Sequence, residues 1–164
     1  MNEPRIFMSQ IKNILLVCSG NTARSPAAEY LAKYYADKYD AKLHFDSAGF
    51  FNAFTYMQPE SRNYLSEKGI DHSDFSPKTL NRTLIKTQDL IITMTQSHVN
   101  QILEKYDDVP EIRSKTHTLK EYIGKKGDII DPYYSDHSTY MRVLRDLDDY
   151  IEQLVKKIIE INQE

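Results

Sequence analysis

The segment that decides the fold is Leu15-Leu16-Val17-Cys18-Ser19-Gly20-Asn21-Thr22-Ala23-Arg24-Ser25-Pro26. Its aliphatic beginning predicts a buried β-strand, because short apolar runs of this kind fill the interior of a parallel sheet. Pro26 suits the first position of a helix, where its fixed φ fits and no N–H is needed. Only a tight loop can join the two. The segment therefore predicts a strand, a loop and a helix in immediate succession.

The rest of the chain continues this alternation of short apolar runs and amphipathic stretches, which is typical of βα units and a parallel sheet. We expect strands at 13–17, 43–47, 90–94 and 115–118, and helices at 26–39, 59–68, 96–106 and from 137 onwards. Apolar residues at steps of four and three mark the last helix, and we interpret this stripe as a core face rather than a surface for a partner helix. The stripe consists of Tyr140, Leu144, Leu147, Ile151, Leu154, Ile158 and Ile161. The predicted fold class is α/β, with three layers and a four-stranded parallel sheet flanked by helices.

The length of 164 residues fits one compact domain. We assign residues 12–164 to this domain and expect residues 1–11 to be a loosely held N-terminal end. A net charge of −3 offers no basic field for nucleic acid, and no apolar stretch approaches the ~20 residues of a membrane span. A single cysteine cannot form an internal disulfide, which fits a reducing compartment. We therefore expect a cytoplasmic monomer that binds neither nucleic acid nor membrane.

The loop at 19–24 has the composition of an anion-binding site. If it curls around one point beyond the strand, its backbone N–H groups form a nest for phosphate, and the next helix directs its positive end at the same point. Gly20 and Asn21 tolerate the left-handed angles that so tight a loop needs. Arg24 follows Cys18 after five residues, so its planar guanidinium can close the cradle with two parallel hydrogen bonds. The predicted phosphate-binding residues are Ser19, Gly20, Asn21, Thr22, Ala23 and Arg24.

Cys18 is the candidate nucleophile. Amide donors, a helix N-terminus and a guanidinium around its sulfur all favour the thiolate over the thiol. The thiolate can attack phosphorus in line while the loop and Arg24 hold the other phosphate oxygens. Ser25 is placed to donate a hydrogen bond to the sulfur when it becomes a leaving group. An isolated cysteine is more often a small buried hydrophobe, but the strand, the loop and the arginine around this one favour catalysis.

Transfer to sulfur also needs a proton donor for the departing oxygen, and the sequence offers Asp131. Proline follows it, which keeps its backbone out of the helical region and gives its side chain a defined direction. Asp131 can act first as the acid and then as the base that activates water. Asp-Pro alone usually marks a turn, so this interpretation depends on the upstream loop. Asp128 is the nearest rival, but no proline follows it.

Three motifs together resemble those of the low-molecular-weight protein tyrosine phosphatase family. They are Val-Cys-x-Gly-Asn-x-x-Arg-Ser-Pro at 17–26, Asp-Ser-Ala-Gly at 46–49 and Asp-Pro-Tyr-Tyr at 131–134. The resemblance extends from about residue 13 to the C-terminus. It implies a metal-independent phosphatase that needs no cofactor, acts on phosphorylated proteins or peptides and releases inorganic phosphate. It also implies Cys18 as nucleophile, Arg24 as phosphate ligand, Asp131 as general acid, and a hydrogen-bonded support for the loop from Asn21, Ser25 and Ser47.

The sequence departs from the family pattern at two positions. Ala23 replaces a second loop cysteine, so oxidised Cys18 has no neighbouring thiol with which to form a protective disulfide. Ala53 aligns near the position at which many members carry an aromatic residue, although several aromatic residues surround it. A flat aromatic substrate favours aromatic pocket walls. We expect these walls to be Phe51, Phe54, Tyr133 and Tyr134.

The alternative to a tyrosine phosphatase is a protein-arginine phosphatase of the same family, which acts on phosphoarginine. Thr22 resembles the threonine of bacterial phosphoarginine phosphatases, whereas Tyr133 and Tyr134 resemble the tyrosine-specific branch, and we favour phosphotyrosine. Arsenate reductase, which shares the fold, needs further cysteines, and a non-catalytic phosphate-binding module needs neither Cys18 nor Asp131. The five histidines show no metal-ligand spacing, and we interpret them as structural or surface residues.

Overall fold

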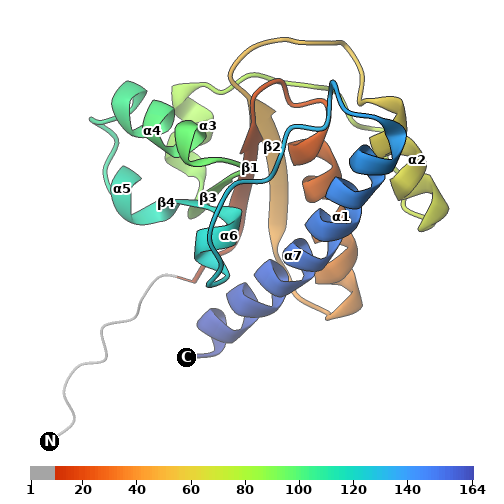
Figure 1. Cartoon of the computed structure of the whole chain (residues 1–164). Coiled ribbons are helices and arrows are strands. Elements are labelled where there is room, and N and C mark those ends of the chain that lie inside the picture. Colours follow the sequence, from red (N-terminus) through yellow and green to blue (C-terminus); the bar gives the residue numbers. More distant parts are fainter. Residues whose placement is uncertain (1–9) are drawn as a thin grey trace, which may run out of the picture.

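A four-stranded parallel sheet forms the centre of the molecule in the computed structural model, which describes residues 10–164 (Figure 1). Its strands lie in the order β2-β1-β3-β4. Their bounds are Asn13–Cys18 for β1, His44–Gly49 for β2, Leu90–Thr93 for β3 and Thr116–Thr118 for β4. β1 pairs with β2 and β3, so Cys18 ends a strand in the middle of the sheet, opposite Gly49 of β2.

Helices cover both faces of the sheet (Figure 1). One face carries α1 (Arg24–Lys38), α2 (Pro59–Glu67) and the long α7 (His137–Gln163), with α6 (Leu119–Tyr122) beside α7. The other face carries α3 (Arg82–Thr87), α4 (Gln96–Lys105) and α5 (Ile112–Lys115). The predicted α/β class and the three-layer arrangement are confirmed by this architecture.

β1 separates two hydrophobic cores and contributes to both. Ile14 and Leu16 point into the larger core under α1 and α7, whereas Leu15 and Val17 point into the smaller core under α4. All four side chains are fully buried. A strand covered on both faces must be apolar at every position, and burying each such side chain contributes about 1.5 to 3 kcal/mol. This burial fixes the position from which the following loop leaves the sheet.

The predicted strands and long helices are confirmed within about two residues at their ends. The placement of Pro26 at the first helical position was wrong, because α1 begins at Arg24 and Pro26 is its third residue. At that position the missing N–H is still one that lacks a partner within the helix. The short helices α3, α5 and α6 were not predicted, since a helix of four to six residues shows no periodicity.

The apolar stripe of α7 packs against the larger core as expected, and only Ile161 near its end is partly exposed. Beside that end, Asn162 exchanges two side-chain hydrogen bonds with the backbone of Ile11, each 2.8 Å long. The expectation of a loosely held N-terminal end concerns mostly residues 1–9, which lie outside the described residues. Between residues 10 and 164, no helix combines the length and the apolar character required to cross a membrane.

Candidate active site

Neighbouring segments hold the loop between β1 and α1 by donating hydrogen bonds to its backbone carbonyl groups. The oxygen of Ser19 accepts from Phe50 N at 2.7 Å, that of Thr22 accepts from Gln58 N at 2.7 Å, and that of Ala23 accepts from the hydroxyl of Ser61 at 3.1 Å. Because these carbonyls turn to neighbouring segments, the N–H groups between them are free to face the inside of the loop. The first turn of α1 adds further donors to this row, because the first N–H groups of a helix have no partner within it. No side chain satisfies them here, since the N-cap residue is Ala23.

The two loop residues expected to tolerate left-handed backbone angles differ in the structure. Asn21 does so, with φ of 54°. Gly20 does not have a positive φ, so Asn21 supplies the left-handed angle that the loop needs. Glycine is instead favoured here by lack of space, because a Cβ on Gly20 would lie 2.7 Å from the Cβ of Ala53. The loop that follows β2 therefore packs directly on the phosphate-loop backbone.

A buried hydrogen-bond network supports the loop from behind. The side-chain amino group of Asn21 donates to the hydroxyls of Ser25 and Ser47, each at 2.9 Å, and its side-chain oxygen accepts from Lys78 N at 3.0 Å. Asn21, Ser25 and Ser47 are all fully buried. These contacts hold Asn21 in its left-handed conformation, whose cost alone is on the order of 1 kcal/mol. The three residues that the family resemblance grouped as a support lie together.

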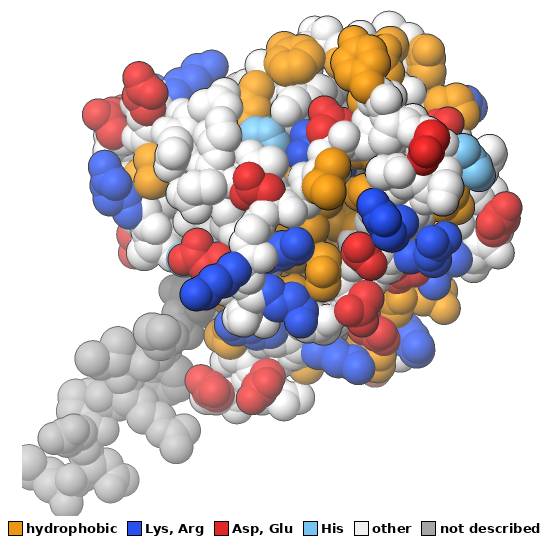
Figure 2. Space-filling model, in the orientation of Figure 1, with side chains coloured by type: hydrophobic (Ala, Val, Ile, Leu, Met, Phe, Trp, Pro, Cys, Tyr) orange, Lys and Arg blue, Asp and Glu red, His pale blue; other side chains and the backbone are white. Residues whose placement is uncertain are grey.

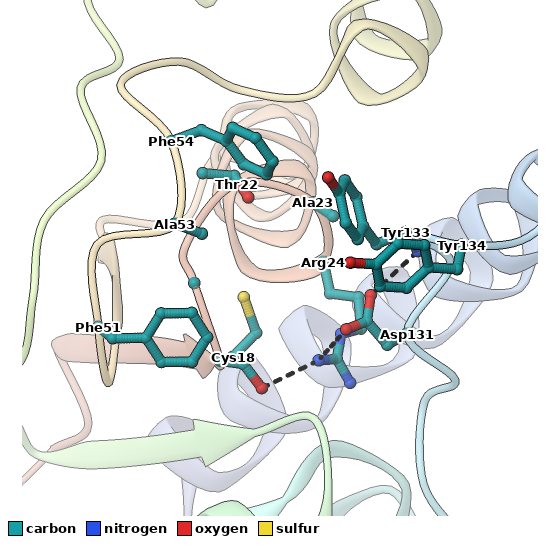
Figure 3. A pocket seen from close by; sticks show the side chains of 12 residues that line it. Cys18, Thr22, Ala23, Arg24, Phe51, Ala53, Phe54, Asp131, Tyr133 and Tyr134 are labelled. Atoms are coloured by element: carbon teal, nitrogen blue, oxygen red, sulfur yellow. Dashed lines mark hydrogen bonds and ion pairs between the residues drawn. The ribbon is translucent and has the colours of Figure 1, made fainter.

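The sulfur of Cys18 lies at the floor of a cavity. Its residue is only 2% exposed and packs at the edge of the larger core, yet it lines the cavity together with the loop. The sulfur lies 2.9 Å from the hydroxyl oxygen of Ser25 in the first turn of α1. Figure 3 shows the side chain directed into the open space between the aromatic walls, away from the sheet.

Arg24 closes one side of this cavity. Its guanidinium is almost completely buried, donates to the carbonyl oxygen of Ile129 at 2.9 Å and approaches the hydroxyl of Ser19 at 3.5 Å. One of its nitrogens lies 3.6 Å from a carboxylate oxygen of Asp131 (Figure 3). Asp131 itself is more than half exposed and accepts from Tyr133 N at 3.1 Å, an arrangement that orients its carboxylate. The arginine and the aspartate thus come together from segments about one hundred residues apart.

The cavity has a volume of about 360 Å³ and two aromatic walls (Figure 3). Phe51 and Phe54 come from the loop after β2, Tyr133 and Tyr134 come from the segment before α7, and the rings of Phe54 and Tyr133 meet with their centroids 5.4 Å apart. Phe51 and Tyr134 are largely exposed at the mouth. Figure 2 shows hydrophobic side chains gathered at the upper edge of the molecule, over the loop between β2 and α2. The remaining lining residues are Cys18, Ser19, Gly20, Thr22, Ala23, Arg24, Ala53 and Asp131.

One histidine beside the loop, His98 in α4, belongs to no pattern that would have marked it in the sequence. Its Nε2 lies 3.0 Å from the hydroxyl oxygen of Ser19, and its ring packs against Phe50. Burial, and then the charge of Arg24, lower the pKa of His98 to about 4, so the ring is neutral at physiological pH. The histidines were expected to be structural or surface residues, and the structure places His98 against the loop at 19–24. Among residues 10–164, no group of three or more His, Cys, Asp or Glu side chains is arranged to hold a metal ion.

Comparison with known proteins identifies the family. A cysteine at the floor of a strand-to-helix anion loop, on a four-stranded parallel sheet, places the molecule among the small α/β phosphatases. The family model described as low molecular weight phosphotyrosine protein phosphatase matches residues 13–164. The chain belongs to this family.

Its relatives carry two different names. A low-molecular-weight protein-tyrosine-phosphatase of Acinetobacter johnsonii is 39% identical over 80% of this chain and 87% of its own length. A protein-arginine-phosphatase of Bacillus subtilis is 33% identical over 89% of this chain and 96% of its own length. Among solved structures, the low-molecular-weight protein tyrosine phosphatase from T. tengcongensis has a TM-score of 0.82 and 32% identity, covering 89% of this chain and 99% of that one. A cysteine-to-serine variant of the arginine phosphatase YwlE, solved with a phosphorylated active-site serine, has a TM-score of 0.81 and 32% identity, covering 88% and 94%.

Proposed function

We propose that this protein is a protein-tyrosine phosphatase that hydrolyses phosphotyrosine through a phosphocysteine on Cys18. The observation that carries the proposal is the cavity itself: the sulfur of Cys18 lies at its floor, the buried guanidinium of Arg24 lies at its side, and Asp131 lies beside that guanidinium. The phosphorylated active-site serine of the YwlE variant supports a covalent phosphoenzyme, because serine there replaces the cysteine.

In the first step, the thiolate of Cys18 attacks phosphorus while Arg24 and the loop N–H groups bind the phosphate oxygens. An S–P bond forms and the P–O bond to the tyrosine oxygen breaks. Asp131, in its protonated form, gives its proton to that departing oxygen. The aromatic walls hold the phenol ring on the axis of attack.

In the second step, Asp131 is a carboxylate and takes a proton from a water molecule that attacks phosphorus. A new P–O bond forms, the S–P bond breaks and the sulfur leaves as a thiolate. The hydroxyl of Ser25, 2.9 Å away, donates a hydrogen bond to the sulfur and stabilises its negative charge. Inorganic phosphate is released and Asp131 has regained its proton.

We also propose that the substrates are phosphorylated proteins or peptides and that the enzyme works as a monomer in the cytoplasm. The single cysteine needs a reducing compartment to remain a nucleophile.

Turnover of p-nitrophenyl phosphate and of a phosphotyrosine peptide tests the proposal. The wild type should hydrolyse both, and Cys18→Ser should hydrolyse neither at a measurable rate. Acid quenching during turnover should leave phosphate on Cys18, where its identification is unambiguous because the chain has no other cysteine. No turnover by the wild type would leave a phosphate-binding module as the function.

Protein-arginine phosphatase remains the second candidate, because Thr22 lines the cavity and two relatives carry that name. Phosphotyrosine and phosphoarginine peptides should be compared with wild type and Thr22→Ile, with Tyr134→Phe on the opposite wall as the matched control. We expect the wild type to favour phosphotyrosine and Thr22→Ile to increase that preference. A wild type that favours phosphoarginine, and loses this preference in Thr22→Ile but not in Tyr134→Phe, would establish the second candidate.

A further inference from the structure

We propose that Glu29 is a positioning residue: it fixes the hydroxyl of Ser47, Ser47 helps to hold Asn21 in place behind the loop, and Asn21 commits the proton of Ser25 to the sulfur of Cys18. This inference rests on the proposed function, since it assigns a task to a residue that supports the nucleophile.

Glu29 lies in the second turn of α1 and faces the sheet. Its side chain is only 6% exposed. One carboxylate oxygen accepts from the hydroxyl of Ser47 at 2.5 Å, and the other accepts from the ammonium group of Lys33 at 2.6 Å. Burial raises the pKa of Glu29, while Lys33 and Ser47 oppose that rise and Asp46 adds to it slightly. Burying a carboxylate costs free energy unless it is paired or hydrogen-bonded. The contact with Ser47 therefore suggests a task for Glu29 in the network behind the loop.

The direction of the network starts at Asn21. Its side-chain oxygen must face the N–H of Lys78, 3.0 Å away, because a backbone N–H can only donate. Its amino group therefore faces both serine hydroxyls and donates a hydrogen to each. Neither Ser25 nor Ser47 can give its own proton to Asn21.

Each serine must then direct its single hydroxyl proton elsewhere. Ser47 has Glu29 within reach, and an ionised carboxylate only accepts. Ser25 has the sulfur of Cys18 within reach at 2.9 Å. The two bonds that Asn21 donates thus commit the proton of Ser25 to the sulfur, and Glu29 fixes the hydroxyl of Ser47 that holds Asn21 in place. The hydroxyl of Ser25 then has no other acceptor to choose, and its hydrogen bond to the sulfur favours the thiolate over the thiol.

Alkylation of Cys18 by iodoacetamide tests this role without phosphatase turnover. Cys18 is the sole cysteine, so the rate reports one sulfur, and its pH dependence reports thiolate formation. In Glu29→Leu, which has no acceptor for Ser47, the pH at which the rate is half-maximal should rise by about one unit, the size expected for weakening a hydrogen bond to a charged group. Glu29→Gln retains an oxygen acceptor and should shift by less than half as much.

The matched control is Asp37→Asn, which removes a charge from the exposed side of the same helix and should leave the half-maximal pH unchanged. Ser47→Ala breaks the link between Glu29 and Asn21, should give a similar rise, and should remove any further effect of Glu29→Leu when the two are combined. Thermal unfolding and circular dichroism identify variants that fail to fold. If Glu29→Leu is one of them, the measurement on Ser47→Ala tests the proposal by itself.

Three results would overturn the proposal. If Glu29 acted only through its negative charge, Glu29→Leu and Glu29→Gln would both lower the half-maximal pH. An unchanged value in folded Glu29→Leu or Ser47→Ala would show that the network has no effect on the sulfur. Additive effects in the double variant would show that Glu29 does not act through Ser47. A missing phosphatase activity would contradict the proposed function but would leave this measurement interpretable.

Discussion

At the scale of single residues, the candidate site places its proposed nucleophile and its proposed general acid in different surroundings. Cys18 is buried at the floor of the cavity, whereas Asp131 is more than half exposed at its side and is oriented by its bond from Tyr133 N. Arg24 lies beside Asp131 and donates a hydrogen bond to the carbonyl oxygen of Ile129. In the proposed mechanism, binding of phosphate and donation of a proton therefore depend on different residues, and they can be tested separately.

Replacing Asp131 by alanine should slow hydrolysis of phenyl phosphate by roughly 10²- to 10⁴-fold, the contribution typical of a positioned general acid. The affinity for inorganic phosphate should change far less, because the loop and Arg24 remain. Steady-state kinetics together with phosphate inhibition constants measure both quantities. Equal losses in the two would remove Asp131 from the role of acid.

The contact between Gly20 and Ala53 predicts a compensating pair of substitutions. Gly20→Ala should destabilise the protein by about 1 to 3 kcal/mol and lower its activity, because the added Cβ displaces the loop. Ala53→Gly in the same chain removes the opposing Cβ and should restore most of both. Chemical unfolding and p-nitrophenyl phosphate turnover measure the recovery. A double variant as impaired as Gly20→Ala would mean that the glycine is needed for another reason.

At the scale of elements, α2 ends in a motif that can be isolated from the site. Gly69 follows the C-cap with φ of 76°, its N–H donates to Ser66 O, and Ile70 N donates to Leu65 O. This pair of bonds is a Schellman motif, which satisfies carbonyls at the end of the helix. Apart from Gly69 itself and its two chain neighbours, no heavy atom of the described residues lies within 4 Å of a Cβ placed on Gly69, so only the backbone conformation opposes a side chain there.

Gly69→Ala should therefore cost about 1 kcal/mol of stability, since alanine disfavours the left-handed region, and it should leave phosphatase activity unchanged. Gly69→Asn is the matched variant and should cost less, because asparagine tolerates this conformation better. Urea unfolding measures both. A loss of activity without a loss of stability would show that the end of α2 is coupled to the site.

At the scale of the whole molecule, His98 links the site to acid stability. Its pKa is lowered to about 4 in the folded protein by burial and then by Arg24, against an ordinary value of 6.5. Between these pH values the unfolded chain binds a proton that the folded protein does not, so stability falls as the pH falls through this window.

Replacing His98 by glutamine, which can still reach Ser19, should reduce this loss between pH 6.5 and 4 by roughly 2 kcal/mol. Urea unfolding at several pH values measures how the free energy of unfolding changes with pH, which is the slope compared between the proteins. His44 is exposed on β2 and provides the control, since His44→Gln should leave the slope as in the wild type. The same slope in all three proteins would contradict the burial of a neutral His98.

The sequence by itself determined the α/β class, the four strands and the order of strand, loop and helix around Cys18. It could do so because these features depend on local periodicity and on the conformational limits of neighbouring residues. The residues proposed for catalysis could also be named from the sequence, since Cys18, Arg24 and Ser25 lie within one short segment and a proline follows Asp131.

Only the tertiary structure decided the contacts made between distant segments. The carboxylate of Glu29 meets Ser47 from a neighbouring strand, His98 meets Ser19, and Ala53 lies against Gly20. Glutamate, histidine and alanine are common at unremarkable positions in helices and loops, so no pattern in the chain distinguishes these three. Their roles come from packing on the two faces of the sheet, which brings together side chains that the sequence separates.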